Sequence, residues 1–264
     1  MISTTHAIAL RGVRKSFDGK RTFAVDDVSL DIAPGEFLAV IGSSGSGKTT
    51  ILRTINRLIE PDEGEVLIEG RSAFDEPAHV LRRRMGYVIQ GVGLFPHLTI
   101  AENIAVMPNL LGWARGDVDA RVAELLDMVE LPAAEYARRM PSALSGGQRQ
   151  RIGVARALAA KPHIMLMDEP FGALDPVTRD SLTEAYRKLH DRLGLTSVMI
   201  THDVQEALLM ADRLAVMAGG RLLACGTPRE LAANDADRRV REMLDMPRRQ
   251  ARRVRERLAD DANG

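Results

Sequence analysis

The sequence predicts an α/β fold whose mainly parallel β-sheet is interrupted by a block of inserted helices. Along the 264 residues, short apolar runs typical of buried strands alternate with segments whose apolar residues recur at steps of three and four. Strands that alternate with helices favour a parallel sheet. From about residue 98 to residue 156 only the helical spacing is present, so this stretch is predicted to be a helical insert.

The candidate strands either alternate in polarity or are apolar throughout. They lie at residues 7–13, 24–32, 37–41, 66–68, 87–89, 164–167, 197–200 and 214–217. The candidate helices have apolar residues at helical spacing and lie at residues 48–58, 100–111, 118–129 and 148–159. Gly219-Gly220 follows the last strand and precedes Leu222 and Leu223, which predicts a tight hairpin turn.

The composition narrows the possible partners. There are 36 basic and 36 acidic residues, so no overall positive charge points to a nucleic acid. Cys225 is the only cysteine, which excludes an intrachain disulfide and fits a reducing compartment. The first 13 residues lack the basic flank and apolar core of a signal peptide, and no run approaches the roughly 18 apolar residues that cross a bilayer. A role at a membrane is therefore predicted to be that of a peripheral subunit.

Residues 236–264 are predicted to form an arginine-rich helical tail. Its arginines are mixed with a few acidic and apolar residues and lie at Arg238, Arg239, Arg241, Arg248, Arg249, Arg252, Arg253, Arg255 and Arg257. Such a run can be a solvent-exposed terminal helix, or a patch that contacts anionic lipid or a neighbouring subunit. The sequence is compatible with both interpretations.

The strongest functional motif follows the candidate strand at residues 37–41. Eight residues fit the pattern G-x-x-x-x-G-K-[ST] without a mismatch: Gly42, Ser43, Ser44, Gly45, Ser46, Gly47, Lys48 and Thr49. Glycines let backbone N–H groups turn towards phosphate oxygens, and the helix that follows presents its positive end to the same anion. In this pattern Lys48 contacts the β- and γ-phosphates, and Thr49 can coordinate Mg²⁺. The loop, continued to Thr50, therefore predicts a nucleoside triphosphate site.

Two acidic residues follow another buried strand, at residues 164–167. At the carboxyl end of a parallel strand, Asp168 can hold Mg²⁺ through water, and Glu169 is placed to deprotonate or orient the attacking water. His202 follows the strand at residues 197–200 and is predicted to lie near the γ-phosphate. The other histidines show no metal-ligand spacing and receive no catalytic role.

The segment Leu144-Ser145-Gly146-Gly147-Gln148 distinguishes this chain from other phosphate-loop proteins. It resembles the signature of ABC ATPases, and about residues 7–231 follow the motif order of that family. The resemblance implies a P-loop NTPase, RecA-like core with an antiparallel β subdomain and an α-helical subdomain inserted at about residues 95–158. This ATPase domain is expected to occupy residues 1–235.

The same resemblance implies roles for further residues. Phe17 is expected to stack on adenine, and Gln90 to sense Mg²⁺ and the attacking water. Asp175 matches the last position of a loop that communicates across a dimer, Gly172-Ala173-Leu174-Asp175. His202 matches the switch histidine of the family.

The signature also has a physical basis in helix electrostatics. Ser145 and the glycines after it open a helix whose N–H groups and dipole can bind a γ-phosphate. In the family that phosphate belongs to ATP on another subunit, so Ser145, Gly146, Gly147 and Gln148 are predicted to act in trans. The resemblance thus implies a head-to-tail dimer, expected to be a homodimer, that holds two ATP molecules.

A narrower resemblance covers residues 87–104, which read YVIQGVGLFPHLTIAENI, and continues at residues 106–108 and 110–113. These segments look like those of importers of quaternary amines such as glycine betaine, choline, carnitine and proline betaine. In such importers this segment meets a cytoplasmic helix of a separate permease, so Phe95 and His97 are predicted to form the coupling surface. The resemblance also implies a substrate-binding protein and a location on the cytoplasmic face of the inner or plasma membrane.

Two departures weaken the substrate prediction. Arg149 stands where the osmoprotectant group more often has glutamine, and the chain ends at residue 264, where many members continue into regulatory CBS domains; none is expected here. An importer ATPase for a polyamine, a sulfonate or an amino acid is therefore the main alternative. An ABC ATPase outside transport is less favoured, because the stretch from Lys48 to Ser145 is too short for a long coiled coil and the chain has one phosphate loop.

Overall fold

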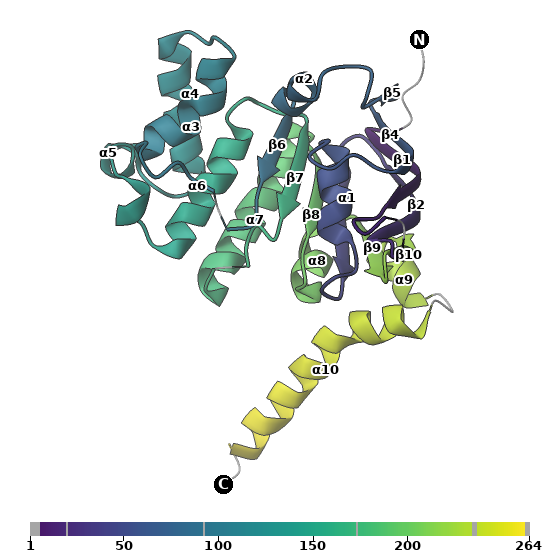
Figure 1. The fold of residues 1–264 in the computed structure, drawn as a ribbon. Coiled ribbons are helices and arrows are strands. Elements are labelled where there is room, and N and C mark those ends of the chain that lie inside the picture. The colour runs from purple at the N-terminus through teal and green to yellow at the C-terminus, as the bar shows by residue number, and fades with distance from the viewer. Residues whose placement is uncertain (1–5, 20, 92, 173, 234–236, 262–264) are drawn as a thin grey trace.

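The computed structural model describes residues 6–19, 21–91, 93–172, 174–233 and 237–261. Its strands form two sheets, with a block of helices on the left in Figure 1. The strands are β1 (Ile8–Lys15), β2 (Val25–Ile32), β3 (Phe37–Gly42), β4 (Glu63–Ile68), β5 (Arg71–Ser72), β6 (Met85–Val88), β7 (Ile164–Asp168), β8 (Thr196–Ile200), β9 (Arg213–Ala218) and β10 (Arg221–Gly226). The helices are α1 (Lys48–Ile55), α2 (Ala78–Arg83), α3 (Ile100–Leu110), α4 (Arg115–Met128), α5 (Ala133–Tyr136), the 3₁₀ turn η1 (Pro141–Ala143), α6 (Gly146–Leu158), α7 (Pro176–Leu193), α8 (Val204–Met210), α9 (Pro228–Ala233) and α10 (Arg238–Asp261).

The larger sheet has six strands in the order β10-β9-β3-β8-β7-β6. The strands from β9 to β6 run parallel, and β10 is antiparallel to its neighbour β9. β3, β7 and β8 are buried along their whole length. This burial explains why they are mostly apolar, with polar residues only at the end of β7 (Asp168) and the start of β8 (Thr196 and Ser197). The carboxyl ends of the parallel strands meet at one edge of the sheet, where ligands bind in open α/β folds.

The predicted turn at Gly219-Gly220 joins β9 to β10. Ala218 pairs with Arg221, which leaves the two glycines as the loop. Their φ angles are positive, 55° and 80°, as a two-residue type I′ hairpin requires. The structure confirms the predicted hairpin.

Two hydrophobic cores lie on opposite faces of β3. Phe37, Ala39 and Ile41 belong to the core that includes the helical insert, whereas Leu38 and Val40 belong to the core that includes α1 and the antiparallel sheet. This alternation is the two-residue period of a strand. The smaller sheet has the order β2-β1-β4-β5 and is antiparallel throughout, as the family resemblance predicts.

Helices α3 to α6 form the insert between β6 and β7. Two of them begin with a capping box, made by Thr99 and Glu102 in α3 and by Ser145 and Gln148 in α6. Each box pairs backbone N–H groups that the start of a helix otherwise leaves unsatisfied. The predicted helical insert is therefore present, and its first and last long helices start at defined residues.

The structure differs from the prediction in several elements. The helix predicted at residues 48–58 ends at Ile55, because Arg57 has a φ of 54° and the Leu58 and Ile59 amides both donate to Arg53 O. The strand predicted at residues 87–89 lies instead at Met85–Val88. The prediction also lacks the elements α2, α5, α7, α8, α9 and β5. Among the described residues, no helix is long and apolar enough to cross a membrane.

Candidate active site

The phosphate-loop residues form the connection from β3 to α1. Gly42 has a φ of 154°, and a Cβ there would lie 2.2 Å from Met217 O. Gly47 has a φ of 97°, and its Cβ would lie 2.2 Å from Ala24 O. Both neighbours are backbone atoms, so these two positions require glycine. α1 has no acidic residue in its first turn, which leaves its positive end available to an anion.

The Lys48 ammonium lies inside this loop. Its Nζ donates to Gly42 O at 2.8 Å and to Ser43 O at 2.9 Å, and the residue is 8% exposed. Burial lowers the pKa of Lys48, although the nearby charges of Glu169 and Asp168 act in the opposite direction. The two carbonyls are neutral, so a phosphate group can supply the close charge partner that they do not.

Asp168 ends β7 and contacts Thr49 at the start of α1. Thr49 Oγ1 donates to Asp168 Oδ1 at 3.2 Å. The other oxygen, Oδ2, is buried without a hydrogen-bond partner among the described residues. Burial raises the pKa of Asp168 and outweighs the bond from Thr49 and the charge of Arg53. A buried carboxylate oxygen without a partner is costly and indicates that a ligand completes the site.

A Mg²⁺ ion fits these two residues. Mg²⁺ prefers oxygen ligands and usually binds through one or two carboxylates, water and substrate phosphates. Thr49 and Asp168 offer a hydroxyl and a carboxylate beside the phosphate loop. Among the described residues, no cluster of three His, Cys, Asp or Glu side chains could hold a metal by itself. Apart from Gln90, which is predicted as a further ligand, the remaining ligands would therefore come from water and phosphate.

We expect Asp168→Asn to raise the free energy of unfolding of the nucleotide-free protein at pH 7. The pKa of Asp168 is raised by folding, so the unfolded chain loses its proton first and stability falls as the pH rises through the ordinary carboxyl range. Asparagine removes the buried charge, and a gain of about 1 kcal/mol is expected. Urea denaturation at pH 7 and pH 4 measures this gain, which should shrink at pH 4. Lower stability of the variant at pH 7 would contradict the burial argument.

Glu169 is the residue at which three distant segments meet. Its Oε2 accepts a hydrogen bond from Gln90 Nε2 at 3.0 Å, and its Oε1 lies 3.3 Å from His202 Nδ1. Its backbone N donates to Ile200 O at 2.9 Å, which fixes it to the end of β8. The φ of Glu169 is 49°, a left-handed conformation that is unfavourable for glutamate and is found preferentially at functional sites. Gln90 and His202, which were predicted separately, thus both contact the carboxylate of Glu169.

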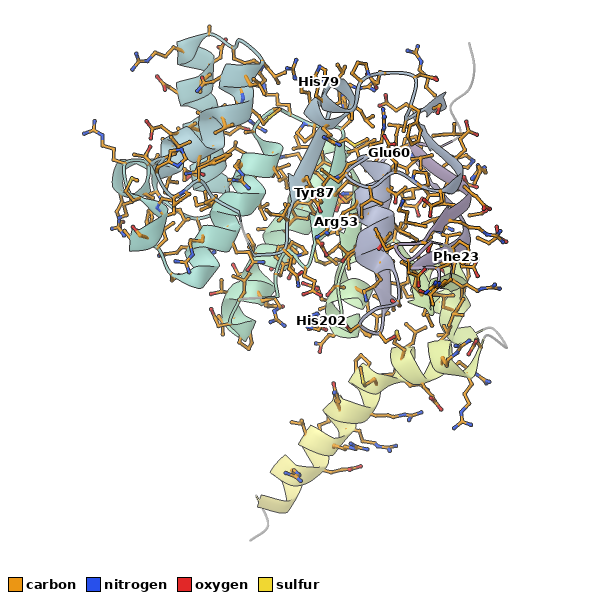
Figure 2. All side chains as sticks on the ribbon, viewed as in Figure 1. Phe23, Arg53, Glu60, His79, Tyr87 and His202 are labelled. Carbon is orange, nitrogen blue, oxygen red and sulfur yellow. The ribbon has the colours of Figure 1, made fainter. Side chains whose placement is uncertain are left out.

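A cavity of about 580 Å³ opens beside these residues. It is lined by Ala24, Ser44, Gly45, Ser46, Gly47, Lys48, Thr49, Thr50, Gln90, Glu169 and His202. His202 is exposed and lies at the lower end of the larger sheet in Figure 2. Most of the predicted phosphate loop and all four predicted catalytic residues therefore border one cavity.

The signature residues do not line this cavity. Ser145 caps α6, Gly146 and Gly147 form its first turn, and Gln148 completes the capping box. Gln148 Nε2 also donates to Tyr136 Oη at 3.2 Å. The signature is therefore not part of the lining of the cavity beside the phosphate loop of the same chain, and its role in trans stays a prediction.

Two other predicted residues also lie outside the cavity lining. Asp175 caps α7, where its carboxylate accepts a hydrogen bond from Thr178 N at 3.0 Å. Phe17 is 65% exposed, and Lys15 Nζ lies 5.6 Å from the centre of its ring. Ala173 and Val92, which belong to the predicted dimer loop and coupling segment, lie outside the described residues.

Gln150 is a site residue that the sequence prediction does not include. It is 4% exposed on α6, and its Nε2 donates to Glu169 O at 3.2 Å and to Pro170 O. It thereby fixes the backbone on the far side of Glu169. A signal was present, because Gln150 lies four residues before Val154 and eight before Leu158 on the buried stripe of α6. A polar side chain on such a stripe needs a partner.

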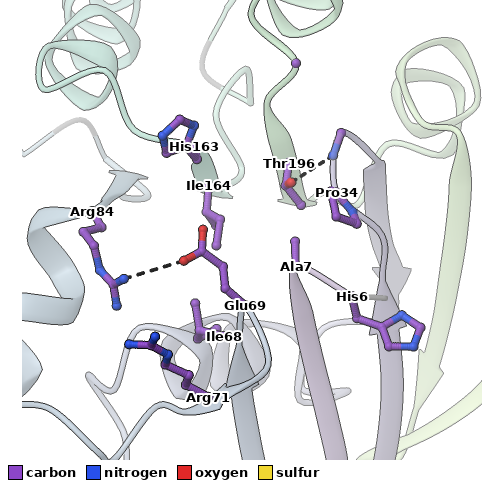
Figure 3. A pocket seen from close by; sticks show the side chains of 12 residues that line it. His6, Ala7, Pro34, Ile68, Glu69, Arg71, Arg84, His163, Ile164 and Thr196 are labelled. Carbon is purple, nitrogen blue, oxygen red and sulfur yellow. Dashed lines mark hydrogen bonds and ion pairs between the residues drawn. The ribbon is translucent and has the colours of Figure 1, made fainter. Parts of the chain in front are cut away.

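A second cavity lies at the opposite edge of the larger sheet (Figure 3). Its lining includes Ile164 and Thr196, the first residues of β7 and β8, with Arg84 and Glu69 nearby. Arg84 Nη1 lies 3.6 Å from Glu69 Oε2. None of the residues predicted to bind nucleotide lines this cavity, so the candidate active site is at the carboxyl ends of the strands.

The parallel core, the antiparallel sheet, the helical insert and the phosphate loop together define an ATP-binding cassette. The chain belongs to the ABC transporter family, which residues 25–172 match. It is 49% identical over 241 residues to the choline transport ATP-binding protein OpuBA of Bacillus subtilis, which corresponds to 91% of this chain and 63% of that protein. It is 46% identical over 244 residues to the glycine betaine uptake system ATP-binding protein YehX of Escherichia coli, at 92% of this chain and 76% of that protein.

The similar proteins also include one whose name gives another solute, and a solved structure. A sulfate/thiosulfate import ATP-binding protein of Caulobacter vibrioides is 47% identical over 225 residues, which is 84% of this chain and 65% of that protein. Among solved structures, a dimeric ATP-binding cassette in a post-hydrolysis state with ADP and phosphate superimposes with a TM-score of 0.76 at 34% identity, over 83% of this chain and 98% of that chain. The chain spans less than two thirds of the length of the Bacillus subtilis choline transport relative.

Proposed function

We propose that this protein is the ATP-binding and ATP-hydrolysing subunit of an ABC importer. The observation that carries the proposal is the convergence of Gln90 and His202 on the Glu169 carboxylate, beside the phosphate loop. A carboxylate in that position can accept a proton from water as the water attacks the γ-phosphate. Gln90 Nε2 is an N–H donor that can orient the same water. A measurement of ATP hydrolysis by the wild-type chain and by the Glu169 variant described in the Discussion tests this proposal.

The other predicted residues take their roles around this centre. Gly42 to Thr50, with Lys48, bind the phosphates, and Phe17 stacks on adenine. Thr49, Asp168 and Gln90 would hold Mg²⁺, which when bound would supply positive charge beside the phosphates. His202 contacts the γ-phosphate.

The proposed enzyme acts as a head-to-tail dimer. Ser145, Gly146, Gly147 and Gln148 bind the γ-phosphate of ATP on the other subunit through the start of α6, and Asp175 communicates between the two sites. Two observations support this arrangement: the signature lies away from the phosphate loop of its own chain, and a dimeric cassette is among the similar structures.

We further propose that the importer takes up a quaternary amine such as glycine betaine, choline, carnitine or proline betaine. The names of the choline and glycine betaine relatives support this proposal, and the sulfate/thiosulfate relatives keep another small solute as the alternative. Calorimetry on the partner substrate-binding protein, with betaine, choline, carnitine, proline and sulfate as ligands, tests the assignment. Binding of sulfate without binding of any quaternary amine would favour the alternative.

The proposed permease contact lies in an apolar groove of about 420 Å³ between the core and the insert. Its lining includes Leu58, Tyr87, Ile89, Phe95, Val106 and Met107. Phe95 is 42% exposed, and the rings of Phe95 and His97 lie 6.0 Å apart. An exposed aromatic side chain beside an apolar groove suits the docking of a short helix from another protein. Through this contact the subunit would lie peripherally on the cytoplasmic face of the membrane.

Asn103→Ala is expected to weaken this contact surface. The Asn103 side chain is fully buried, accepts from Phe95 N at 2.8 Å and donates to Phe95 O, Leu98 O and Thr99 O at 3.0–3.1 Å. Alanine removes the partner of Phe95 N and of Leu98 O, whereas Phe95 O and Thr99 O keep their backbone donors. We expect a loss of about 2 kcal/mol in the free energy of unfolding. Chemical denaturation measures this loss. The neighbouring exposed Asn109→Ala on α3 serves as the control, and equal effects of the two variants would contradict the positioning role.

A further inference from the structure

The C-terminal helix α10 carries an apolar stripe that only its first part buries. Val240 and Leu244 belong to the core, where α10 contacts α8 and α9. Pro247, Ala251 and Val254 continue the stripe at steps of three and four residues. Val254 is nevertheless 58% exposed, because this part of α10 has left the body of the protein. Figure 1 shows α10 passing below the ends of α1 and α8.

Arginines surround the exposed part of this stripe. Residues 246–257 contain six arginines and one acidic residue, Glu256. Arg248, Arg252 and Arg255 each follow a stripe residue by one position, which places them about 100° around the helix, along one edge of the stripe. We call these three the edge row. Arg249 and Arg253 each follow a stripe residue by two positions and lie on the opposite face of the helix; we call these two the back row.

A surface of opposite charge lies between α7 and α8. A pocket of about 160 Å³ there is lined by Asp180, Asp203 and Glu206 and by one basic residue, Arg179. Glu206 is 7% exposed, yet its Oε1 has no hydrogen-bond partner among the described residues. Arg179 is already paired with Asp203 at 3.2 Å. The pocket thus places a buried, unpartnered carboxyl oxygen of Glu206 beside the exposed carboxylate of Asp180, an arrangement that can accept hydrogen bonds from an arginine side chain.

One exposed apolar side chain lines the same pocket, and a second directly follows the lining residue Pro176 in the chain. Leu209 lines it and is 66% exposed, and Val177, at the start of α7, is 80% exposed. Apolar side chains that are this exposed beside a charged pocket are typical of a protein contact surface. The combination matches α10, which offers an apolar stripe with arginines along one edge.

We propose that residues 246–257 of α10 dock on the second copy of this chain in the dimer. The stripe covers Val177 and Leu209 of the other copy, and an edge-row arginine enters its acidic pocket. This inference rests on the proposed head-to-tail dimer. The starts of α7 and α8 follow β7 and β8, so the pocket lies at the edge of the sheet that the second copy faces, and α10 extends beyond that same edge. Pairing of α10 with α10 is disfavoured, because it would bring arginines together.

The test compares two variants of equal charge in a Glu169→Gln background, with the dimer dissociation constant measured in ATP by analytical ultracentrifugation. Edge-row replacement by Arg252→Glu and Arg255→Glu is expected to weaken the dimer about tenfold or more. Back-row replacement by Arg249→Glu and Arg253→Glu changes the net charge by the same amount on the other face of the helix and is expected to change the constant less than twofold. Equal weakening by both variants, or weakening by neither, would overturn the proposal.

Cross-linking supplies a second, independent measurement. In a Cys225→Ser, Glu169→Gln background, one population carries Val254→Cys and a second, differently tagged population carries Leu209→Cys. A short bifunctional thiol reagent is expected to join the two tags in ATP, whereas Arg115→Cys, on the exposed side of α4, should not replace Val254→Cys. A dimer that forms without this cross-link would show that α10 lies elsewhere.

Two further outcomes separate this inference from its alternatives. If the parent Glu169→Gln protein does not dimerise in ATP, the proposed dimer and the docking both fail. If the parent dimerises and the edge-row variant dimerises as tightly as the parent, the docking alone fails. Sedimentation with vesicles of phosphatidylglycerol tests the lipid interpretation: edge-row-dependent binding to vesicles, with an unaffected dimer, would assign α10 to the membrane and overturn the proposal.

Discussion

Glu169→Gln is expected to lower ATP turnover by about a hundredfold or more while ATP binding is retained. Glutamine has nearly the shape of glutamate, so contacts with Gln90 and His202 can still form. The amide cannot accept a proton from water as a carboxylate does, and the general-base contribution is lost. Glu169 already has a φ of 49°, and glutamine is no more strained there than glutamate. The fold should therefore be unchanged.

Turnover is measured as phosphate release, and binding with a fluorescent ATP analogue. The variant should also accumulate as an ATP-bound dimer in size-exclusion chromatography, because bound ATP is no longer hydrolysed. Glu184→Gln is a matched control: Glu184 lies on the surface of α7 and pairs with Lys188 at 2.7 Å. That control should hydrolyse ATP at the wild-type rate. Full turnover by Glu169→Gln would remove Glu169 from the proposed role of general base.

The elements that could be predicted from the sequence are those in which a single physical requirement restricts the residue types. β3, β7 and β8 could be predicted because strands that are buried on both faces are mostly apolar. The phosphate loop was predicted because its glycines have conformations and close contacts that other residues do not tolerate. Once strand ends are assigned, a parallel sheet brings them to one edge. This is why Asp168 and His202, which are 34 residues apart, were placed at one site in advance.

The prediction failed where polar residues are buried. α7 was missed although it has 18 residues, because its buried face comprises Leu182, Thr183, Tyr186, Leu189 and His190. Leu182, Tyr186 and Leu189 keep steps of four and three, but Thr183 and His190 stand where further apolar residues would widen the stripe that marks a helix. His190 is 1% exposed and bonds Ser197 Oγ at 2.9 Å and Gly35 O at 3.2 Å. Partners that distant in sequence cannot be read from local spacing.

The backbone conformation of Glu169 also could not be predicted from the sequence. Its left-handed φ depends on the hydrogen bond that its backbone N–H donates to Ile200 O and on Gln150, which donates from α6 to Glu169 O and Pro170 O. Both contacts join elements that are remote in the chain. The identity of the carboxylate could thus be predicted, but the way in which the fold orients it could not.

Lys48→Ala is expected to weaken ATP binding about a hundredfold. The ammonium is buried between Gly42 O and Ser43 O, so it meets a phosphate in a site from which water is largely excluded. A hydrogen bond between charged groups in such a place contributes about 3 kcal/mol, which corresponds to about a hundredfold in affinity. Burial lowers the pKa of Lys48, which means that the charged ammonium is poorly solvated in the nucleotide-free protein. A bound phosphate compensates for this lost solvation.

Isothermal titration with ATP and Mg²⁺ measures the loss, with circular dichroism to show that the variant is folded. Lys188→Ala is the matched control, because Lys188 is 73% exposed on α7 and far from the loop in sequence. Its affinity for ATP should equal that of the wild type. Lys48→Arg extends the test: the guanidinium is larger and planar, so it cannot occupy the same position between two carbonyls, and it should restore little affinity. An unchanged affinity of Lys48→Ala would refute the assignment of residues 42–49 as the phosphate site.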